Sequence, residues 1–349
     1  MSTRRLRVAR GFVLAVVLCA LALVVSSCAS DFDPISKLKS VRMLATRIDK
    51  PYAKPGETVT FETLAFDARV DKSRPMKLSW IPLPCINPTN DLYYLCFQQL
   101  AAANGDGGTP APGSPGALLR PGVDLTPFLP GGPTYSFTIP TNIVDTHPPV
   151  PGASDLYGLA IVFNIACAGH VEITLPGAGD IRKQQVPIGC FDENHTRLGA
   201  DDFVIGIQRV YAYNDRTNAN PVIDHVVFEG QPVDLSQGIA IDHCTAARSR
   251  DCAQLKMDVV VPDTSWETNP GDTDVGGKVR NEQIWVDYYS TIGDFSGDAR
   301  LLYDPAQGHV SDSETKYQSP FDPGDGVVFV VVHDNRGGAA WAQFPVHVR

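Results

Sequence analysis

The sequence lacks the motifs that mark common catalytic and phosphate-binding sites. It contains no Gly-x-Ser-x-Gly nucleophile turn, no His-Glu-x-x-His zinc helix and no glycine-rich phosphate loop. It also lacks any Cys-x-x-Cys pair, and its 8 histidines show no metal-ligand spacing, which argues against a zinc site. Because catalysis needs convergent acid, base or nucleophile groups, the sequence favours a protein that is not an enzyme.

Long apolar runs are equally scarce. The longest, Phe12 to Val25, has about 14 residues, whereas a helix that spans a bilayer needs about 20. Four arginines without an acidic residue precede it, and the small residues Ser26 and Ser27 follow it. This arrangement predicts a secretory signal peptide over residues 1–27 rather than a transmembrane helix.

The end of this segment, Val25-Ser26-Ser27-Cys28, resembles the lipobox of bacterial lipoproteins. The resemblance implies that Cys28 becomes the first residue and carries a diacylglycerol and an N-acyl chain, which together anchor a protein stably. Ala29 follows, not the aspartate of the inner-membrane retention signal, so we expect an outer-membrane lipoprotein facing the periplasm or the cell surface. Residues 28–39 are expected to be the lipidated cysteine and a polar tether. An ordinary signal peptide with a chance cysteine is the alternative.

Basic residues are outnumbered by acidic ones. The mature chain has 349 − 27 = 322 residues, enough for two domains, and 29 − 4 = 25 Lys and Arg against 39 Asp and Glu, a net charge of −14. An acidic body has no electrostatic reason to bind nucleic acid or anionic lipid. We therefore expect no nucleic-acid partner, a membrane contact through the lipid anchor, and an envelope protein or glycan as partner.

The remaining six cysteines are an even number, which in an exported protein predicts three disulfides. Fifteen pairings are open, but the spacing favours sequential ones. A hairpin that turns at Gly177 to Asp180 would place the middle two cysteines opposite each other. The expected disulfides are Cys85–Cys96, Cys167–Cys190 and Cys244–Cys252.

Helical periodicity is also rare, and Gly and Pro number 30 and 28, which favours many short strands joined by turns. Strands are expected over residues 41–48, 59–63, 78–80, 134–139, 159–167 and 184–190, and then over 204–207, 210–213, 223–228, 255–261, 282–289, 327–332 and 339–348. The run 159–167 is almost continuously apolar, as in a strand buried on both faces.

The first strands, with a Pro-Gly-Glu turn between them and Trp80 on the third, resemble the opening of an immunoglobulin-like β-sandwich. Tyr157 resembles that family's tyrosine corner, although the second strand here lacks the family's cysteine. The opening Val-Arg-x-Leu-Ala … Pro-Gly-Glu-Thr-Val after a lipobox is similar to uncharacterised lipoproteins of high-GC Gram-negative bacteria. The resemblance implies an all-β protein with two immunoglobulin-like sandwiches, over residues 40–192 and 203–349, separated by a polar boundary. A Gly/Pro-rich loop, about residues 97–133, is expected to be mostly disordered.

Loop aromatics are the best candidates for binding a partner. Tyr93, Tyr94 and Trp266 have no evident core periodicity, although the sequence favours local packing under their loops over partner binding, whereas Trp80, Trp285 and Trp341 lie in expected strands and suit a core. Asp294 and Asp298 are weak candidates for calcium, since acidic turns are usually only turns. No other metal or cofactor is expected.

The sequence thus predicts a non-catalytic envelope component. Two alternatives stay open: a carbohydrate-active or other hydrolase with a site of loop carboxylates, and a subunit of an envelope secretion or motility assembly.

Overall fold

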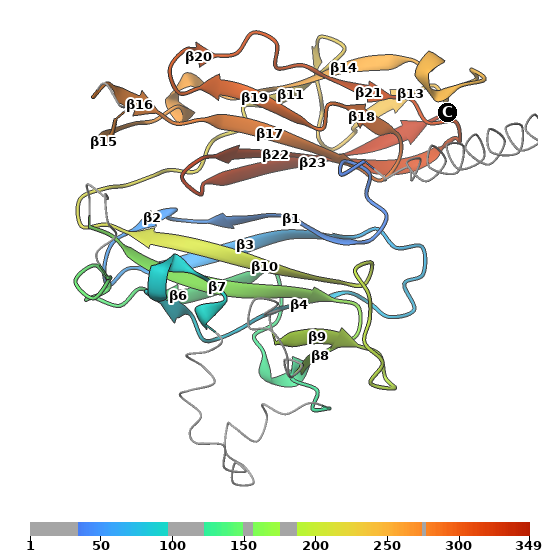
Figure 1. The fold of residues 1–349 in the computed structure, drawn as a ribbon. Helices are drawn as coiled ribbons and strands as arrows, with labels where there is room; N and C mark the ends of the chain where they lie inside the picture. The colour runs from blue at the N-terminus through green and yellow to red at the C-terminus, as the bar shows by residue number, and fades with distance from the viewer. Residues whose placement is uncertain (1–33, 97–121, 149–155, 175–186, 274–276) are drawn as a thin grey trace, which may run out of the picture. The chain divides into compact units, whose positions relative to one another are not determined.

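The computed structural model describes residues 34–96, 122–148, 156–174, 187–273 and 277–349 (Figure 1). Residues Ser36–Arg349 form one compact unit of strands and short 3-10 helices. The signal peptide, Cys28 and residues 97–121 of the expected loop lie outside the described residues. Within the described part of the chain, no helix is long and apolar enough to cross a membrane.

The first sandwich has a three-stranded sheet facing a larger one. The small sheet has the order β1 (Val41–Ile48), β3 (Thr58–Asp67), β6 (Thr134–Thr138). The facing sheet has the order β2 (Tyr52–Ala53), β10 (Phe203–Ala212), β7 (Gly158–Cys167), β4 (Lys77–Trp80), with β5 (Cys85–Ile86) also on β7. Its connections contain the 3-10 helices η1 (Thr89–Asp91) and η2 (Thr126–Phe128). In chain order these sheets are the A-B-E and C-F-G sheets of an immunoglobulin-like domain, as expected, with β2 added in parallel beside β10.

β10 corrects the expected domain boundary. We expected residues 203–349 to form the second sandwich, but β10 pairs along its whole length with β7, from Phe203↔Cys167 to Ala212↔Gly158. Residues 193–202 therefore lie inside the first sandwich, before its last strand. The prediction was wrong because the apolar pattern of a strand specifies which face is buried and not which neighbour it pairs with.

Apolar side chains from both sheets share the core of this sandwich. Trp80 is fully buried and packs against Phe61 of β3 and Tyr135 of β6, with ring centroids 5.7 and 5.4 Å away. Its indole N–H donates to the Gly132 carbonyl at 3.0 Å, so its one polar atom is satisfied. Phe61 lies on β3, which corresponds to the strand that carries the first cysteine in antibody domains, and it packs beside Trp80.

β7 is buried on both faces, as its apolar run predicts. Ala160 and Val162 face the sandwich core, whereas Leu159, Ile161 and Phe163 face a second core on the outer side of the sheet. An insertion between β7 and β10, the hairpin of β8 (His170–Ile173) and β9 (Ile188–Phe191), helps to close this second core, together with the Cys85–Cys96 loop and residues 122–129.

Part of the Gly/Pro-rich loop is therefore ordered. Leu125 is buried in the second core, and its backbone N–H donates to the Val171 carbonyl at 2.8 Å. Residues 122–133 thus belong to the folded body, because this stretch contains an apolar side chain that the insertion buries, and the rest of the expected loop lies outside the described residues.

The second sandwich repeats the same strand order. One sheet has the order β12 (Gln231–Pro232), β11 (His225–Phe228), β14 (Gln254–Val260), β21 (Thr315–Gln318), β18 (Asp294–Ser296). The other has the order β13 (Ile239–Ile241), β23 (Ala339–Val348), β22 (Gly324–Asp334), β17 (Ile284–Ser290), β19 (Ala299–Asp304), β20 (Gly308–His309). A separate pair, β15 (Thr268–Thr273) and β16 (Val279–Asn281), and the 3-10 helices η4 (Ser249–Asp251) and η5 (Asp263–Ser265) lie in connections. β13 runs parallel to β23 as β2 does to β10, so both units are immunoglobulin-like sandwiches.

The two sandwiches pack against each other through an apolar interface. Phe66 of β3 lies 5.1 Å, centroid to centroid, from the buried Phe329 of β22, and Leu44 and Val331 belong to the same cluster. Because these side chains are removed from water by contacts between the sandwiches, the hydrophobic effect holds the two together.

The segment before β1 also contacts the second sandwich. The Leu38 N–H donates to the Ser290 carbonyl and the Ser290 N–H donates to the Ser36 carbonyl, both at 2.8 Å. Leu38 is 3% exposed and Ser36 is fully buried. Residues 36–39, expected to be tether, are therefore part of the folded body.

The three disulfides join the cysteines in the sequential pairs favoured by their spacing: Cys85–Cys96, Cys167–Cys190 and Cys244–Cys252. The hairpin argument for the middle pair was wrong in register, because Cys190 lies opposite Val171 and Cys167 belongs to β7. The disulfide therefore ties the inserted hairpin to the sheet beneath it.

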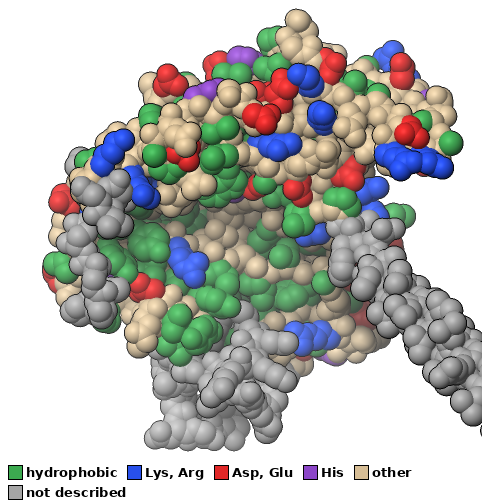
Figure 2. Space-filling view, turned by 45° about the horizontal axis from the view of Figure 1, so that its top comes forward, with side chains coloured by type: hydrophobic (Ala, Val, Ile, Leu, Met, Phe, Trp, Pro, Cys, Tyr) green, Lys and Arg blue, Asp and Glu red, His purple; other side chains and the backbone are tan. Residues whose placement is uncertain are grey.

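Charged side chains of both signs are interspersed on the face shown in Figure 2, where hydrophobic side chains gather over the lower layer. Several large apolar side chains of the first sandwich are exposed, among them Leu156 and Phe128 at 75% and 57%. No charge of one sign dominates this face.

Candidate functional site

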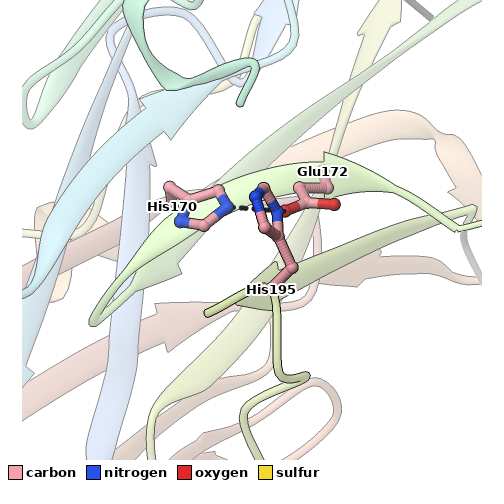
Figure 3. A group of neighbouring side chains, drawn as sticks. All are labelled: His170, Glu172 and His195. Carbon is pink, nitrogen blue, oxygen red and sulfur yellow. Dashed lines mark hydrogen bonds and ion pairs between the residues drawn. The ribbon is translucent and has the colours of Figure 1, made fainter. Parts of the chain in front are cut away.

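Three potential metal ligands meet on the inserted hairpin: His170, Glu172 and His195 (Figure 3). The Nε2 atom of His170 and the Nδ1 atom of His195 lie 2.6 and 2.5 Å from the same carboxylate oxygen, Oε1 of Glu172. The donor atoms of all three side chains lie within 4.8 Å of one another. Among the described residues, this is the one group of three or more His, Cys, Asp or Glu side chains that converge in this way.

Strand geometry places two of these ligands. His170 and Glu172 are the first and third residues of β8, so their side chains leave the strand on the same face. Val171 between them is 1% exposed and packs into the second core of the first sandwich. The hairpin is fixed in turn by the Cys167–Cys190 disulfide.

A tight turn after β9 presents His195. The Asp192 carboxylate accepts the backbone N–H groups of Asn194 and Thr196 at 2.9 and 2.8 Å, and the His195 N–H donates to the Asp192 carbonyl. His195 takes a left-handed backbone conformation with φ 59°, which a non-glycine residue adopts at a cost. The turn thus directs an imidazole whose side chain is 56% exposed toward a carboxylate that is 3% exposed.

Glu172 is the charged centre of the cluster. Burial by itself raises the pKa of Glu172, but hydrogen bonds from His195, His170 and the Gly122 N–H outweigh it, so the pKa lies below the usual value. The Gly122 N–H reaches the second oxygen, Oε2, at 2.9 Å. Glu172 is therefore held as a carboxylate, the form that binds metal ions. Two imidazole nitrogens and one carboxylate oxygen form a donor set that suits zinc, with one coordination position left for a further ligand.

The sequence prediction missed this site. His170 and His195 are 25 positions apart, and only the pairing of β8 with β9 brings them together. One signal was present: the i, i+2 spacing of His170 and Glu172 on a strand next to a disulfide cysteine.

Two of the three aromatic candidates pack against a core, the role that the sequence favoured over partner binding. Tyr93 packs against the second core of the first sandwich, and Tyr94, at 37% exposure, packs edge-on against Tyr93. Trp266 packs against the core of the second sandwich, and its indole N–H donates to the Glu282 carbonyl at 2.7 Å. Of the three, only Tyr94 keeps an exposed ring.

The strand tryptophans differ in their surroundings. Trp80 is core, as expected, but Trp285 is only partly buried and stacks on His333 with centroids 5.2 Å apart. Trp341 lies at the interface between the sandwiches, where the guanidinium of Arg47 lies 4.7 Å above its ring.

The calcium candidates do not form an oxygen cluster in the described residues. An oxygen of Asp294 accepts hydrogen bonds from the Ser36 hydroxyl and from the Phe295 N–H, at 3.1 and 2.8 Å. Asp294 thus helps to fix the segment before β1, and Asp298 joins it in no group of three metal ligands among the residues described.

Tyr157 departs from the tyrosine corner of the immunoglobulin family. Its hydroxyl donates to the Asp91 carboxylate at 2.5 Å, whereas the family's tyrosine bonds to backbone. The other Asp91 oxygen lies 2.9 Å from His147 Nε2, so Asp91 ties the Cys85–Cys96 loop to residues 147 and 157.

Two acids of the second sandwich approach each other, as a site of paired carboxylates would require. Burial, with the charge of Asp334, raises the pKa of Glu282 to about 7, and burial also raises the pKa of Asp334. Both are nearly inaccessible, at 0% and 3% exposure, and Glu282 pairs with Arg336 at 3.2 Å. A substrate cannot reach them, so this pair does not support a hydrolase.

A surface depression of about 370 Å³ lies at one end of the second sandwich and contains two further acids, Glu229 and Asp242. Glu229 accepts a hydrogen bond from the Lys256 backbone N–H. This carboxylate is therefore used in fixing the turn after β11.

Comparison with known proteins finds only remote structural likeness. No protein-family model and no curated protein matches the chain, so the resemblance to lipoproteins of high-GC bacteria stays a prediction. Among solved structures, the tandem Ig repeats of Dlar are similar over 89% of this chain and 99% of theirs, at 11% identity and a TM-score of 0.23. Latent PorU from Porphyromonas gingivalis is similar over 89% of this chain and 24% of its own, at 9% identity and a TM-score of 0.20. Three N-terminal domains of the bacteriophage RB49 outer capsid protein Hoc are similar over 89% of this chain and 99% of theirs, at 9% identity and a TM-score of 0.18. The fold assignment therefore rests on strand order and pairing.

Proposed function

We propose that the protein is an outer-membrane lipoprotein, anchored through lipid on Cys28, whose two immunoglobulin-like sandwiches bind an envelope protein or glycan without catalysing a reaction. The observation that carries this proposal is the set of three disulfides, and it agrees with the secretory leader that the sequence predicts over residues 1–27. Disulfides persist in oxidising compartments outside the cytoplasm.

A binding role is supported by how the acidic groups are used. Glu282 and Asp334 are buried out of reach of a substrate, and Asp91 and Asp192 hold loops in place. Sandwich domains of this kind commonly present loops and sheet faces to partners from a rigid scaffold. The alternative role as a subunit of an envelope assembly differs from lone binding only in the permanence of the contact.

The anchor is tested by metabolic labelling with a palmitate analogue. Cys28→Ala should abolish the label and leave the precursor unprocessed, whereas Cys19→Ala, within the leader, should leave labelling unchanged. Label that persists in Cys28→Ala overturns the anchoring proposal.

The binding role is tested by crosslinking on intact cells, followed by purification in detergent. A discrete crosslinked species that survives purification identifies an assembly, and one seen only after crosslinking identifies a transient partner. Recovery of the uncrosslinked chain alone, at every crosslinker length, contradicts the binding role.

A further inference from the structure

We propose that His170, Glu172 and His195 bind one zinc ion and leave a fourth coordination position open to water or to a side chain of a partner. This inference is independent of the lipid anchor and of the partner's identity, since it rests on the β8–β9 hairpin and the turn after β9.

The donor set selects the metal. Calcium and magnesium prefer sites made of oxygen ligands, whereas two imidazoles and one carboxylate suit zinc. No cysteine thiol of the folded body competes with these side chains for the metal, because its six cysteines form three disulfides. A site with three protein ligands is also typical of zinc centres that retain an open position.

The geometry is close to that of a zinc centre. Zinc–nitrogen and zinc–oxygen bonds of about 2.0–2.1 Å in a tetrahedron place ligand atoms about 3.3 Å apart. The two imidazole nitrogens lie 2.5 and 2.6 Å from the Glu172 oxygen, so each must withdraw by less than about 1 Å to admit the ion. His195 has room for this movement, because its side chain is 56% exposed.

The surroundings fix the ligands as metal sites require. The second oxygen of Glu172 is held by the Gly122 N–H at 2.9 Å, which orients the carboxylate. One imidazole would suffice to satisfy Oε1 by hydrogen bonding. The turn at Asp192 nevertheless places a second, largely exposed imidazole on the same atom and holds it in a left-handed conformation. Zinc accounts for this convergence, and it would tie the turn after β9 to β8.

Solvent and a partner can approach the cluster at His195, whose side chain is 56% exposed. A water molecule completes the ion in the free protein, and a histidine or carboxylate of a bound partner completes it in a complex. Zinc would then strengthen binding to such a partner.

The test is a zinc titration of the full-length protein, purified in detergent without a histidine tag and stripped with a chelator. Bound metal is measured by equilibrium dialysis and elemental analysis. The wild-type protein should bind one zinc per chain at micromolar free metal. His195→Gly, which keeps the left-handed backbone, and His170→Gln should each weaken binding by at least about tenfold.

The matched control is His347, whose Nδ1 atom lies 2.7 Å from Asp325 Oδ1 and whose side chain is 45% exposed. His347→Gln should bind zinc as the wild type does. Circular dichroism of the metal-free variants must match the wild type, so that lost binding reports a lost ligand. Cobalt should give the visible absorption of a low-symmetry centre in wild type and not in His195→Gly, and millimolar calcium should not displace zinc. Fewer than one zinc per chain, undiminished binding in His195→Gly, or displacement by calcium overturns the proposal.

Discussion

The buried acid pair of the second sandwich predicts that stability falls as the pH rises through neutrality. Glu282 is fully buried, and its side chain faces one guanidinium, Arg336, and a second buried acid, Asp334. Two carboxylates beside one cation leave an excess negative charge, so one acid retains its proton. Burial first, and then the charge of Asp334, raises the pKa of Glu282 from 4.5 to about 7.

The sign and size follow from proton linkage. Between pH 4.5 and 7 the folded chain holds a proton on Glu282 that the unfolded chain has released, so the free energy of unfolding decreases as the pH rises through this window. A pKa of about 7 against 4.5 corresponds to a loss of about 2 to 3 kcal/mol between pH 5 and pH 8.

Urea unfolding of wild type and Glu282→Gln, followed by tryptophan fluorescence at pH 5, 6, 7 and 8, measures this contribution. The variant should not show this decline in the free energy of unfolding, so that its stability relative to wild type improves by about 2 to 3 kcal/mol from pH 5 to pH 8. Glu314→Gln is the control, because Glu314 is exposed and pairs with Lys256 on the surface. Parallel pH profiles for wild type and Glu282→Gln would refute the reasoning.

Two further changes test the fold. Replacing Cys167 and Cys190 by alanine opens a loop with a sequence separation of 23 and should lower the free energy of unfolding by about 3 kcal/mol, seen as an earlier urea midpoint; an unchanged midpoint contradicts this. Phe329→Ala removes a ring that is 1% exposed between the sandwiches. It should lower the free energy of unfolding by about 3–5 kcal/mol and separate the thermal unfolding of the two sandwiches in calorimetry. An unaltered single transition would contradict a shared interface.

Local strand structure was predictable where alternation and turns coincide. The bounds expected for β1 and β23 are those observed, Val41–Ile48 and Ala339–Val348. The continuous apolar run of β7 indicated burial on both faces, which the insertion provides. Side-chain alternation carries this information because it depends on each strand's own residues.

Pairing over long distances was not predictable in the same way. The sequence of β10 is equally compatible with the last strand of one sandwich and with the first strand of the next. Only its ten residue pairs with β7 show that it belongs to the first sandwich. The metal ligands show the same limit, since His195 reaches Glu172 only through the hairpin register and the turn at Asp192. The sequence predicted Trp80 as core and favoured local packing for Trp266, but it could not show that Trp266 packs against the core of the second sandwich.

The segment before β1 has a mechanical consequence. Tension entering the chain ahead of Ser36 meets Ser290 of the second sandwich first, through two backbone hydrogen bonds and a parallel bridge at Lys37. Leu38 must leave its apolar cluster at the same step. Only then does the load reach β1 and its register with β3. A pull on the N-terminal residues is therefore borne by the junction of the two sandwiches, and the first sandwich is shielded until that junction opens.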